Sequence, residues 1–458
     1  MKNKIKNIYF VGIGGSGMSG IAEVMHNLKF NVQGSDIGKS EMIQHLKKIG
    51  IKVFGKHLGK NIDQMDVLVV STAVSKQNPE VKAAIAKKIP IIPRAEMLSE
   101  LMRFKKGIAV AGTHGKTTTT SLIASILSKG NLDPTYVIGG RLNSMNTNAK
   151  LGSGDLIVVE ADESDASFLH LNPVNAIITN IDNDHLGTYQ NKFENLKQAY
   201  INFAHQVPFY GTIFICGDDR HAKDIISSIS RPVVTYGLKK NVDIQAVNIR
   251  NEENKVHFKV VDKKYKHNEF EITINFPGDH FVRNSLAAIS IALEYGVSKK
   301  NIQNALLNFD GVARRYEIYN NVAIKNKTIK VIDDYGHHPT EIEAVLKATK
   351  KAFKNKKINL VFQLHRFSRT RDCYKEFIRV LKIPDRIFLF DIYSAGETHL
   401  KGISTKGLMK SLKHPQMHYL PNFRRAKNTI SDLIEDDSIL IIMGAGSIGS
   451  FTQQMIKK

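Results

Sequence analysis

Residues 108–120, with the sequence IAVAGTHGKTTTT, constrain the fold of this chain more than any other stretch. An apolar run with the pattern of a buried strand leads through two glycines to Lys116 and Thr117, and a helical pattern follows. Strand, glycine turn and helix N-terminus together offer backbone N–H groups and the positive end of the helix dipole to a phosphate. Lys116 would reach the outer phosphates, and the Thr117 hydroxyl would bind magnesium. The segment therefore predicts a nucleoside triphosphate site, although Val110 stands where the general motif has its first glycine.

Length and composition set the size of the molecule. At about 150 residues per domain, the 458 residues predict roughly three domains, and the hydrophobic fraction of 42% is sufficient for well-buried cores. No apolar run approaches the roughly 18 residues of a membrane span. The N-terminal residues lead into a glycine turn, which fits a nucleotide site better than a signal peptide. The two cysteines, Cys216 and Cys373, are too few for a disulfide framework and fit a cytoplasmic location.

The chain is strongly basic, with a formal net charge of +22. Its lysines are spread along the sequence, no aromatic-rich basic stripe accompanies them, and tryptophan is absent. Net charge affects solubility and the steering of anionic ligands, and it does not by itself indicate nucleic-acid binding. We therefore interpret the charge as a lysine-rich surface and expect no nucleic-acid partner.

Residues 8–36 read as strand, glycine turn, helix and strand. The strand Ile8–Val11 precedes the turn, the helix is expected over Ile21–Leu28, and the second strand ends at Asp36. An acidic residue at that place is the Rossmann arrangement for a ribose hydroxyl. Further alternating strands and helices predict a parallel sheet that binds its ligand at the carboxyl ends of the strands.

Two more strands of the second region end in polar loops. Glu160 closes one strand and begins the acidic run EADESD, and His185 follows the next strand. Hard oxygen ligands beside a phosphate loop suit magnesium, so Glu160 is our first candidate ligand. Imidazole prefers softer metals than magnesium, so spacing alone does not indicate His185 as a magnesium ligand. It leaves two alternatives for His185, a contact with substrate or no function. Residues 242–276 alternate in the manner of an antiparallel extension, and a helix is expected from about residue 280 to 295.

The third region has two polar clusters after strands. Residues 333–341 place two adjacent histidines before Pro339, where a strand-to-helix turn would splay them apart, so substrate positioning is favoured over zinc. Residues 365–371 carry Arg366 and Arg369, whose forked guanidinium groups match a carboxylate. Both clusters would lie at carboxyl ends of one sheet, which favours a site for an acid group.

Taken together, these stretches resemble the Mur ligases of peptidoglycan synthesis, over essentially the whole chain. The residues that carry the resemblance are 12–20, 112–118, 160–168, 333–341 and 365–372. The combination is specific to the family, whereas one glycine motif alone would not be.

The resemblance implies an α/β fold of three domains. These are an N-terminal Rossmann-like domain for UDP (1–105), a central ATPase-type parallel-sheet domain of the P-loop kind (106–311) and a C-terminal Rossmann-like domain (312–458). It implies the ATP- and Mg²⁺-dependent joining of L-alanine to the lactyl carboxylate of UDP-N-acetylmuramate through an acyl phosphate. The chain would act in the cytoplasm, as a monomer or homodimer, without membrane insertion.

The resemblance also implies residue roles. Catalysis would depend on Lys116, His185, Arg366 and Arg369. ATP would be bound by Gly112, Thr113, His114, Gly115, Lys116, Thr117, Thr118, Asn284 and Arg315. Magnesium would be held by Thr117, Glu160 and His185. The UDP moiety would contact Gly14, Gly15, Ser16, Gly17, Met18, Asp36, His57 and Ser71. L-alanine would be surrounded by Tyr335, His337, Arg366 and Arg369.

Two stretches depart from the family pattern. Leu364 stands where the family usually has proline, and Leu186–Gly187 replaces the usual Met-Asp after His185. These departures affect the fine geometry of two loops rather than the chemistry. Several related ligases carry a modified lysine, but His205–Tyr210 here contains none, so no modified lysine is predicted.

Other functions make different predictions. A recycling ligase would attach a ready-made peptide to the same sugar nucleotide, although the paired arginines and the residues around Tyr335 favour a single small amino acid. An NAD-dependent oxidoreductase would use the first glycine turn but leave residues 112–118 without a purpose. A nucleic-acid binder would show steeply salt-dependent retention on DNA, and we rank it last.

Overall fold

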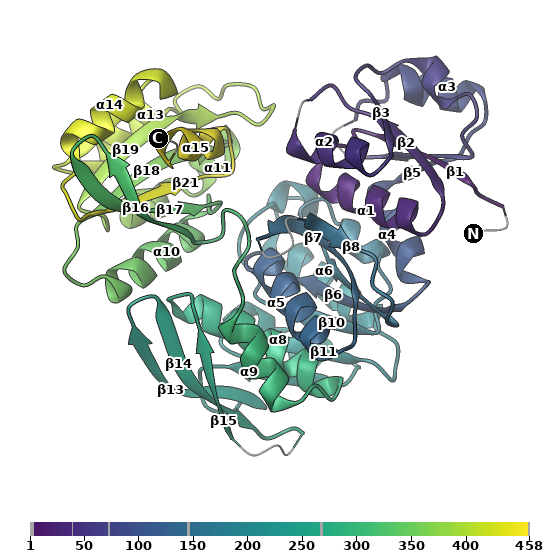
Figure 1. Cartoon of the computed structure of the whole chain (residues 1–458), viewed down its shortest axis with the longest axis horizontal. Coiled ribbons are helices and arrows are strands. Elements are labelled where there is room, and N and C mark those ends of the chain that lie inside the picture. The colour runs from purple at the N-terminus through teal and green to yellow at the C-terminus, as the bar shows by residue number, and fades with distance from the viewer. Residues whose placement is uncertain (1–3, 39, 72–73, 144–146, 266–268, 457–458) are drawn as a thin grey trace. The chain divides into compact units, whose positions relative to one another are not determined.

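The computed structural model describes residues 4–38, 40–71, 74–143, 147–265 and 269–456. Within these residues the strands form three sheets, of five, ten and six strands, which follow one another along the chain (Figure 1). The prediction of three α/β domains is confirmed. The boundaries after residues 105 and 311 stay predictions.

The chain divides into two compact units. Unit 1 consists of Met1–Val247, Lys259–Ile272 and Arg283–Asp310, and unit 2 of Asn248–Phe258, Thr273–Val282 and Gly311–Lys458. The whole first sheet and the strands of the second sheet up to residue 237 lie in unit 1, and the third sheet lies in unit 2.

The first sheet is parallel throughout and has the order β3-β2-β1-β4-β5. Its strands are β1 (Asn7–Val11), β2 (Asn31–Ser35), β3 (Lys52–Phe54), β4 (Val67–Val70) and β5 (Ile91–Pro93). Its helices are α1 (Ser16–Asn27), α2 (Glu41–Lys48), α3 (Pro79–Ala86) and α4 (Arg94–Met102). This is a doubly wound order, in which the chain reverses direction beside β1 and leaves a ligand crevice at the carboxyl end of that strand.

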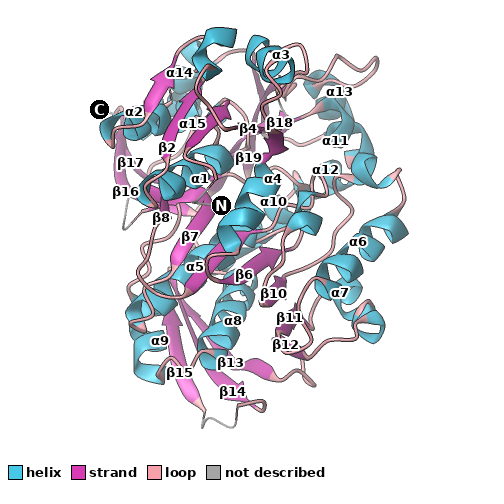
Figure 2. Ribbon diagram, turned by 90° about the vertical axis from the view of Figure 1, so that its right-hand side faces the viewer, coloured by secondary structure: helices cyan, strands magenta, loops and turns pink. Residues whose placement is uncertain are grey.

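The second sheet has the order β15-β14-β13-β12-β11-β10-β6-β9-β7-β8. Its parallel strands are β6 (Lys106–Ala111), β7 (Thr135–Leu142), β9 (Leu156–Glu160), β10 (Asn175–Ile178), β11 (Thr212–Cys216) and β12 (Val233–Gly237), and β8 (Thr147–Lys150) pairs antiparallel with β7. The predicted extension is β13 (Ile244–Glu252), β14 (Lys255–Asp262) and β15 (Phe270–Ile274), but β13 pairs parallel with β12, so the extension does not begin antiparallel as predicted. The helices are α5 (Lys116–Lys129), α6 (Phe193–His205), α7 (Arg220–Asp224), α8 (Asp279–Glu294) and α9 (Lys299–Leu307). Strand β6 is buried along almost its whole length, as expected for the centre of a parallel sheet covered on both faces, and α5 packs on it (Figure 2).

The third sheet has the order β16-β17-β21-β18-β19-β20. Its strands are β16 (Glu317–Ile324), β17 (Lys327–Asp334), β18 (Ile358–His365), β19 (Arg386–Tyr393), β20 (Met417–Leu420) and β21 (Ile439–Met443), and only the β16–β17 pair is antiparallel. The helices are α10 (Pro339–Ala352), α11 (Phe367–Asp372), α12 (Tyr374–Val380), α13 (Thr405–Leu412), α14 (Phe423–Leu433) and α15 (Ile448–Ile456). Helix α10 begins where the sequence predicts it, with Pro339 in the first turn and a capping box between His338 and Glu341.

Helix α1 joins the first sheet to the second within unit 1. A Cβ added at Gly20 would lie 3.1 Å from the Ala149 side chain and 3.2 Å from that of Val137, so the helix backbone lies directly on β8 and β7. Asn148 also donates a hydrogen bond to the Ser19 hydroxyl over 3.3 Å. Close approach of this kind requires a residue without a side chain.

Some local predictions differ from the structure. Helix α1 begins at Ser16, five residues before the predicted start, because the last glycine of the turn already has helical backbone. Strand β6 begins at Lys106, which pairs with Leu156 in the second sheet. No described helix is both long enough and apolar enough to span a membrane.

Candidate active site

The phosphate loop lies between β6 and α5, as predicted. Gly112 has φ +133° and Gly115 has φ +83°, conformations that residues with a side chain rarely adopt. A Cβ at Gly112 would lie 1.9 Å from Thr179 Oγ1, so the loop and the end of β10 require glycine there. The backbone N–H of His114 donates to Asn180 Oδ1 over 2.9 Å, which fixes the middle of the loop.

Lys116 is the first residue of α5, and its ammonium group points back into the loop. Its Nζ donates to Gly112 O over 2.7 Å, to Thr113 O over 3.1 Å and to Glu163 Oε2 over 2.7 Å. Burial opposes a charge on Lys116, but the carboxylates of Glu163, Asp162 and Glu160 together outweigh it and raise the pKa of the lysine. The sequence pattern predicts no separate role for Glu163, although Glu163 stands three residues after Glu160 in the same acidic run.

Thr117 and Glu160 lie in contact at the carboxyl edge of the sheet. Thr117 Oγ1 donates to Glu160 Oε1 over 2.8 Å, and Glu160 Oε2 accepts the N–H of Gly139 over 2.6 Å. Strands β6 and β9 are parallel neighbours, with Val110 opposite Glu160, and this pairing brings the two side chains together. A hydroxyl and a carboxylate are donors that fit Mg²⁺.

The loop after β10 lies against the phosphate loop. His114 Nε2 is 2.9 Å from Asp182 Oδ2, and the N–H of Asp182 donates to Thr113 Oγ1 over 2.9 Å. His185 has φ +56° and its Nε2 lies 3.5 Å from Asp184 Oδ2. Its place around magnesium stays a prediction.

Helix α8 brings Asn284 to the phosphate loop. A Cβ added at Gly115 would lie 2.8 Å from Asn284 Oδ1, so the amide faces the glycine that precedes Lys116. Thr118 is buried in the first turn of α5. The structure thus brings Asn284 to the loop that holds the predicted ATP residues, and its contact with adenine stays a prediction.

The N-terminal turn fits closely around Asp36. The N–H of Gly14 donates to Asp36 Oδ2 over 2.9 Å, and a Cβ at Gly14 would lie 2.6 Å from Ile43 Cγ1 and 2.9 Å from that carboxylate oxygen. Ser71 lies at the end of β4, where its Oγ would be 3.7 Å from a Cβ at Gly12. The turn, Asp36 and Ser71 therefore meet at one edge of the first sheet.

The remaining residues predicted for this turn lie at the start of α1. Gly15 is the N-cap residue, and Gly17 is already within the helix rather than in the turn. The side chain of Ser16 lies outside the described part of the structure. Met18 is 2% exposed and packs into the core, which leaves only its backbone for a nucleotide contact.

His57 belongs to a buried polar cluster that the sequence pattern does not indicate. Its Nδ1 lies 2.9 Å from both Ser35 Oγ and Glu80 Oε2. Glu80 is fully buried, and its other oxygen accepts Tyr9 OH over 2.7 Å and Asn61 Nδ2 over 2.8 Å. A buried carboxylate requires such partners, so Glu80 fixes the orientation of the His57 ring. Glu80 lies on α3, 23 positions after His57, so no local sequence pattern indicates that the two residues pair.

Unit 2 gathers an aromatic and basic cluster at the carboxyl ends of β17 and β18. The rings of Tyr335 and His337 have centroids 5.6 Å apart, and those of His337 and His365 are 5.2 Å apart. His365 stacks on Tyr393 at 5.6 Å, and Arg369 Nη1 lies 3.2 Å from His365 Nδ1. Three of the four residues predicted for L-alanine lie here, together with His365 and Tyr393, which the sequence analysis did not assign.

Arg314 and Arg315 lie over the ring of Tyr335 in the same cluster, and Arg366 directly follows His365 in the chain. Arg366 has φ +69°, and its buried Nε has no hydrogen-bond partner among the described residues. The guanidinium of Arg315 lies 5.0 Å from the centroid of the Tyr335 ring. Arg314 Nε lies 3.3 Å from a carboxylate oxygen of Asp333, whose pKa burial raises to about 6 in spite of that cation. The cluster therefore offers positive charge at an aromatic surface, which suits a small acid group.

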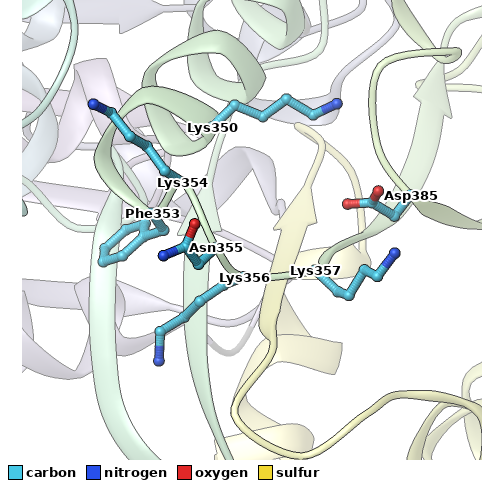
Figure 3. A pocket seen from close by; sticks show the side chains of 7 residues that line it. All are labelled: Lys350, Phe353, Lys354, Asn355, Lys356, Lys357 and Asp385. Atoms are coloured by element: carbon cyan, nitrogen blue, oxygen red, sulfur yellow. The ribbon is translucent and has the colours of Figure 1, made fainter.

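A separate basic pocket lies at the opposite edge of the third sheet. Figure 3 shows its lining residues: Lys350, Phe353, Lys354, Asn355, Lys356, Lys357 and Asp385. Lys357 immediately precedes β18, and Asp385 immediately precedes β19 and accepts the N–H of Ile358 over 2.9 Å. Ligands of such sheets bind at the carboxyl ends of the strands, so this pocket is not part of the candidate active site.

Comparison with family models covers almost the whole chain. Residues 7–106 match the model described as the Mur ligase family, catalytic domain, residues 110–292 match the Mur ligase middle domain, and residues 314–446 match the Mur ligase, glutamate ligase domain.

Relatives and solved structures agree with these matches. The UDP-N-acetylmuramate–L-alanine ligase of Neisseria gonorrhoeae is 47% identical over 463 residues, which cover 100% of this chain and 99% of that protein. The enzyme of the same name from Ralstonia nicotianae is 49% identical over 465 residues, which cover 100% and 96%. The crystal structure of UDP-N-acetylmuramate-alanine ligase from Thermotoga maritima has a TM-score of 0.82 and 28% identity, with 98% of each chain covered. The chain belongs to the Mur ligase family.

Proposed function

We propose that this protein is an ATP-dependent ligase that joins L-alanine to the lactyl carboxylate of UDP-N-acetylmuramate in peptidoglycan precursor synthesis. One observation carries the proposal: relatives that bear this name are 46–49% identical to the chain over nearly its whole length. The phosphate loop, the turn around Asp36 and the cluster around Arg369 provide places for a triphosphate, a sugar nucleotide and an amino acid.

The first step of the proposed reaction makes the carboxylate reactive. A carboxylate oxygen of the sugar nucleotide attacks the γ-phosphorus of ATP, the bond to the β-γ bridging oxygen breaks, and ADP and an acyl phosphate form. Lys116 would neutralise the charge on the transferred group. The oxygens of Thr117 and Glu160 fit Mg²⁺, with His185 as a further predicted ligand, and the ion would offset the charge of the phosphate oxygens.

The second step forms the amide. The amine of L-alanine attacks the carbonyl carbon, a tetrahedral intermediate forms, and phosphate leaves as the nitrogen loses a proton. Arg366 and Arg369 would hold the amino-acid carboxylate, and Tyr335 and His337 would limit the space for its side chain. Asn284 and Arg315 would contact the nucleotide, at the adenine and a phosphate.

The N-terminal turn would hold the UDP moiety. Its backbone N–H groups and the start of α1 would face the diphosphate, and Asp36 would accept from a ribose hydroxyl. His57 and Ser71 lie at the same edge of the sheet. We place the protein in the cytoplasm, with small-molecule substrates and without a nucleic-acid partner.

Phosphate release in reactions that lack one substrate at a time tests the proposal. The complete mixture of MgATP, UDP-N-acetylmuramate and L-alanine should release phosphate, and each omission should reduce the rate to background. Replacement of L-alanine by a tripeptide tests the recycling ligase, which should then be active. ATP left intact by the complete mixture would contradict the proposal.

A further inference from the structure

Glu163 is a buried carboxylate that the proposed mechanism does not use. The residue is 1% exposed, its Oε2 accepts from Lys116 Nζ over 2.7 Å, and its Oε1 is buried without a hydrogen-bond partner among the described residues. Tyr189 OH donates to the backbone oxygen of Glu163, which fixes the loop at this residue. The carboxylate therefore depends on Lys116 as its counter-ion.

The three donors of the lysine ammonium are all in use. Nζ donates to Gly112 O, Thr113 O and Glu163 Oε2, and an ammonium group has three N–H bonds. A contact with a γ-phosphate therefore requires the release of one partner. The two carbonyl oxygens belong to the loop that encloses the phosphates, whereas Glu163 is an anion that another anion can replace.

Replacement of Glu163 by phosphate leaves a charged carboxylate in a buried place without its cation. Such a group is strongly unfavourable, and it becomes neutral by taking up a proton. We infer that MgATP binding transfers the ammonium of Lys116 from Glu163 to the γ-phosphate and that Glu163 takes up one proton from solvent as it loses this partner. The inference rests on the proposed function and specifies how its nucleotide site changes on binding.

Glu163 changes charge near neutral pH, whereas four groups around it do not: Lys116, Asp162, Tyr189 and Tyr200. Burial raises the pKa of Glu163 to about 7, although Lys116 opposes this shift. Burial disfavours charge on Asp162, but Lys116, the hydrogen bonds from Ser164 and the charge of Arg94 together lower its pKa, so it stays ionised. The raised pKa of Lys116 keeps the ammonium group protonated. Burial raises the pKa values of Tyr189 and Tyr200, so both stay neutral.

Calorimetry in buffers of different ionisation enthalpy measures the proton uptake directly. The intact protein is titrated with MgATP, and separately with MgADP, without the other substrates. With a pKa of about 7 in the free protein, uptake should be about half a proton at pH 7 and about one proton at pH 8. MgADP lacks the γ-phosphate, so its binding should cause no proton uptake by Glu163. The Kd for MgATP should rise up to about tenfold per pH unit above pH 7.

Glu163→Gln keeps the shape and removes the charge. MgATP should bind this variant without uptake of this proton and with a Kd that no longer rises between pH 7 and 8. Histidines of the neighbouring loops are unchanged in the variant, so the difference from the wild type isolates Glu163. Glu294→Gln is the matched control, because that carboxylate lies at the end of α8 and bonds Tyr265 and Thr212 instead.

Each outcome has a separate meaning. Uptake that requires both Glu163 and the γ-phosphate supports the inference. MgATP binding to the wild type at pH 8 without proton uptake overturns the inference and leaves the proposed function intact. The inference is also overturned if Glu163→Gln takes up as many protons on MgATP binding as the wild type. Absence of any MgATP binding overturns the proposed function. The wild-type titration decides the matter even if the variant does not fold.

Discussion

Thr117 Oγ1 and Glu160 Oε1 lie 2.8 Å apart, so the first turn of the helix after the phosphate loop contacts the end of the neighbouring strand. The hydroxyl comes from the loop motif and the carboxylate from a residue 43 positions later. Parallel pairing of β6 and β9 makes this meeting inevitable, because the carboxyl ends of adjacent strands share one edge.

The first prediction concerns magnesium. Glu160→Gln should raise the Mg²⁺ concentration required for half-maximal ADP release by about tenfold or more, because an amide is a poorer ligand for a hard cation than a carboxylate. Thr117→Ser should leave the required Mg²⁺ concentration unchanged, and Thr117→Val should raise it, since only serine keeps the hydroxyl. Rates measured against Mg²⁺ concentration at saturating ATP check this, and equal curves for all variants would argue against the site.

The second prediction concerns Lys116. Lys116→Ala should reduce ADP release by about a hundredfold or more, because a charged donor at the transferred phosphate is lost. Binding of UDP-N-acetylmuramate, measured by calorimetry, should change little, since the turn around Asp36 lies on the first sheet. Unchanged turnover would remove Lys116 from the mechanism.

The third prediction concerns the sugar nucleotide. Gly14→Ala would place a Cβ 2.6 Å from Ile43 Cγ1 and 2.9 Å from Asp36 Oδ2. The turn and the carboxylate must then move apart, so KM for the sugar nucleotide should rise by about tenfold, with KM for ATP unchanged. Gly55→Ala is the control, because nothing lies within 4 Å of its added Cβ. An equal effect of both substitutions would refute the argument from close approach.

The fourth prediction concerns the amino acid. Arg369→Lys should raise KM for L-alanine by about tenfold to a hundredfold, because lysine cannot reproduce the planar fork that matches a carboxylate. KM for ATP should stay the same. Arg371→Lys, two positions along, is the control, since this exposed arginine pairs with Asp372. Steady-state kinetics with L-alanine varied distinguish the two.

The fifth prediction concerns pH and stability. Burial raises the pKa of Asp333 to about 6 from a usual value of 3.8, in spite of Arg314. The folded chain therefore binds more protons than the unfolded chain between these values, and the free energy of unfolding falls as pH rises through this window. Asp333 would contribute up to about 3 kcal/mol of this fall. In Asp333→Asn the free energy of unfolding should fall less steeply between pH 4.5 and 6.5. Urea denaturation followed by circular dichroism measures this free energy, and an unchanged slope against pH would contradict the raised pKa of Asp333.

The sequence predicts the fold and the principal loops because their signals are local. The phosphate loop, the turn before Asp36 and the helix that begins at Pro339 each combine a strand pattern with glycine or proline at fixed spacing. Their places at the carboxyl ends of strands follow from the alternation of strands and helices. The structure has these elements where they are predicted, within a few residues.

The sequence does not predict the partners that come from elsewhere in the chain. Glu80 reaches the loop residue His57 from helix α3, and Tyr393 reaches His365 from the next strand along the sheet. Each contact depends on how the elements pack rather than on spacing in the sequence. Glu163 lies within a run that the sequence does indicate, but its pairing with Lys116 instead of a metal depends on burial. Burial of single polar residues is a property of the packed molecule.

The packing of α1 on β7 and β8 has a consequence for the order of the chemistry. The helix starts at the sugar-nucleotide turn, and its side is anchored at Gly20 to the sheet that carries the phosphate loop. Apart from Arg315, the residues proposed to hold the phosphoryl donor and acceptor belong to unit 1, whereas the cluster around Arg369 belongs to unit 2. The division of the polypeptide would then coincide with the division of the reaction: one body activates the acid and the other delivers the amine.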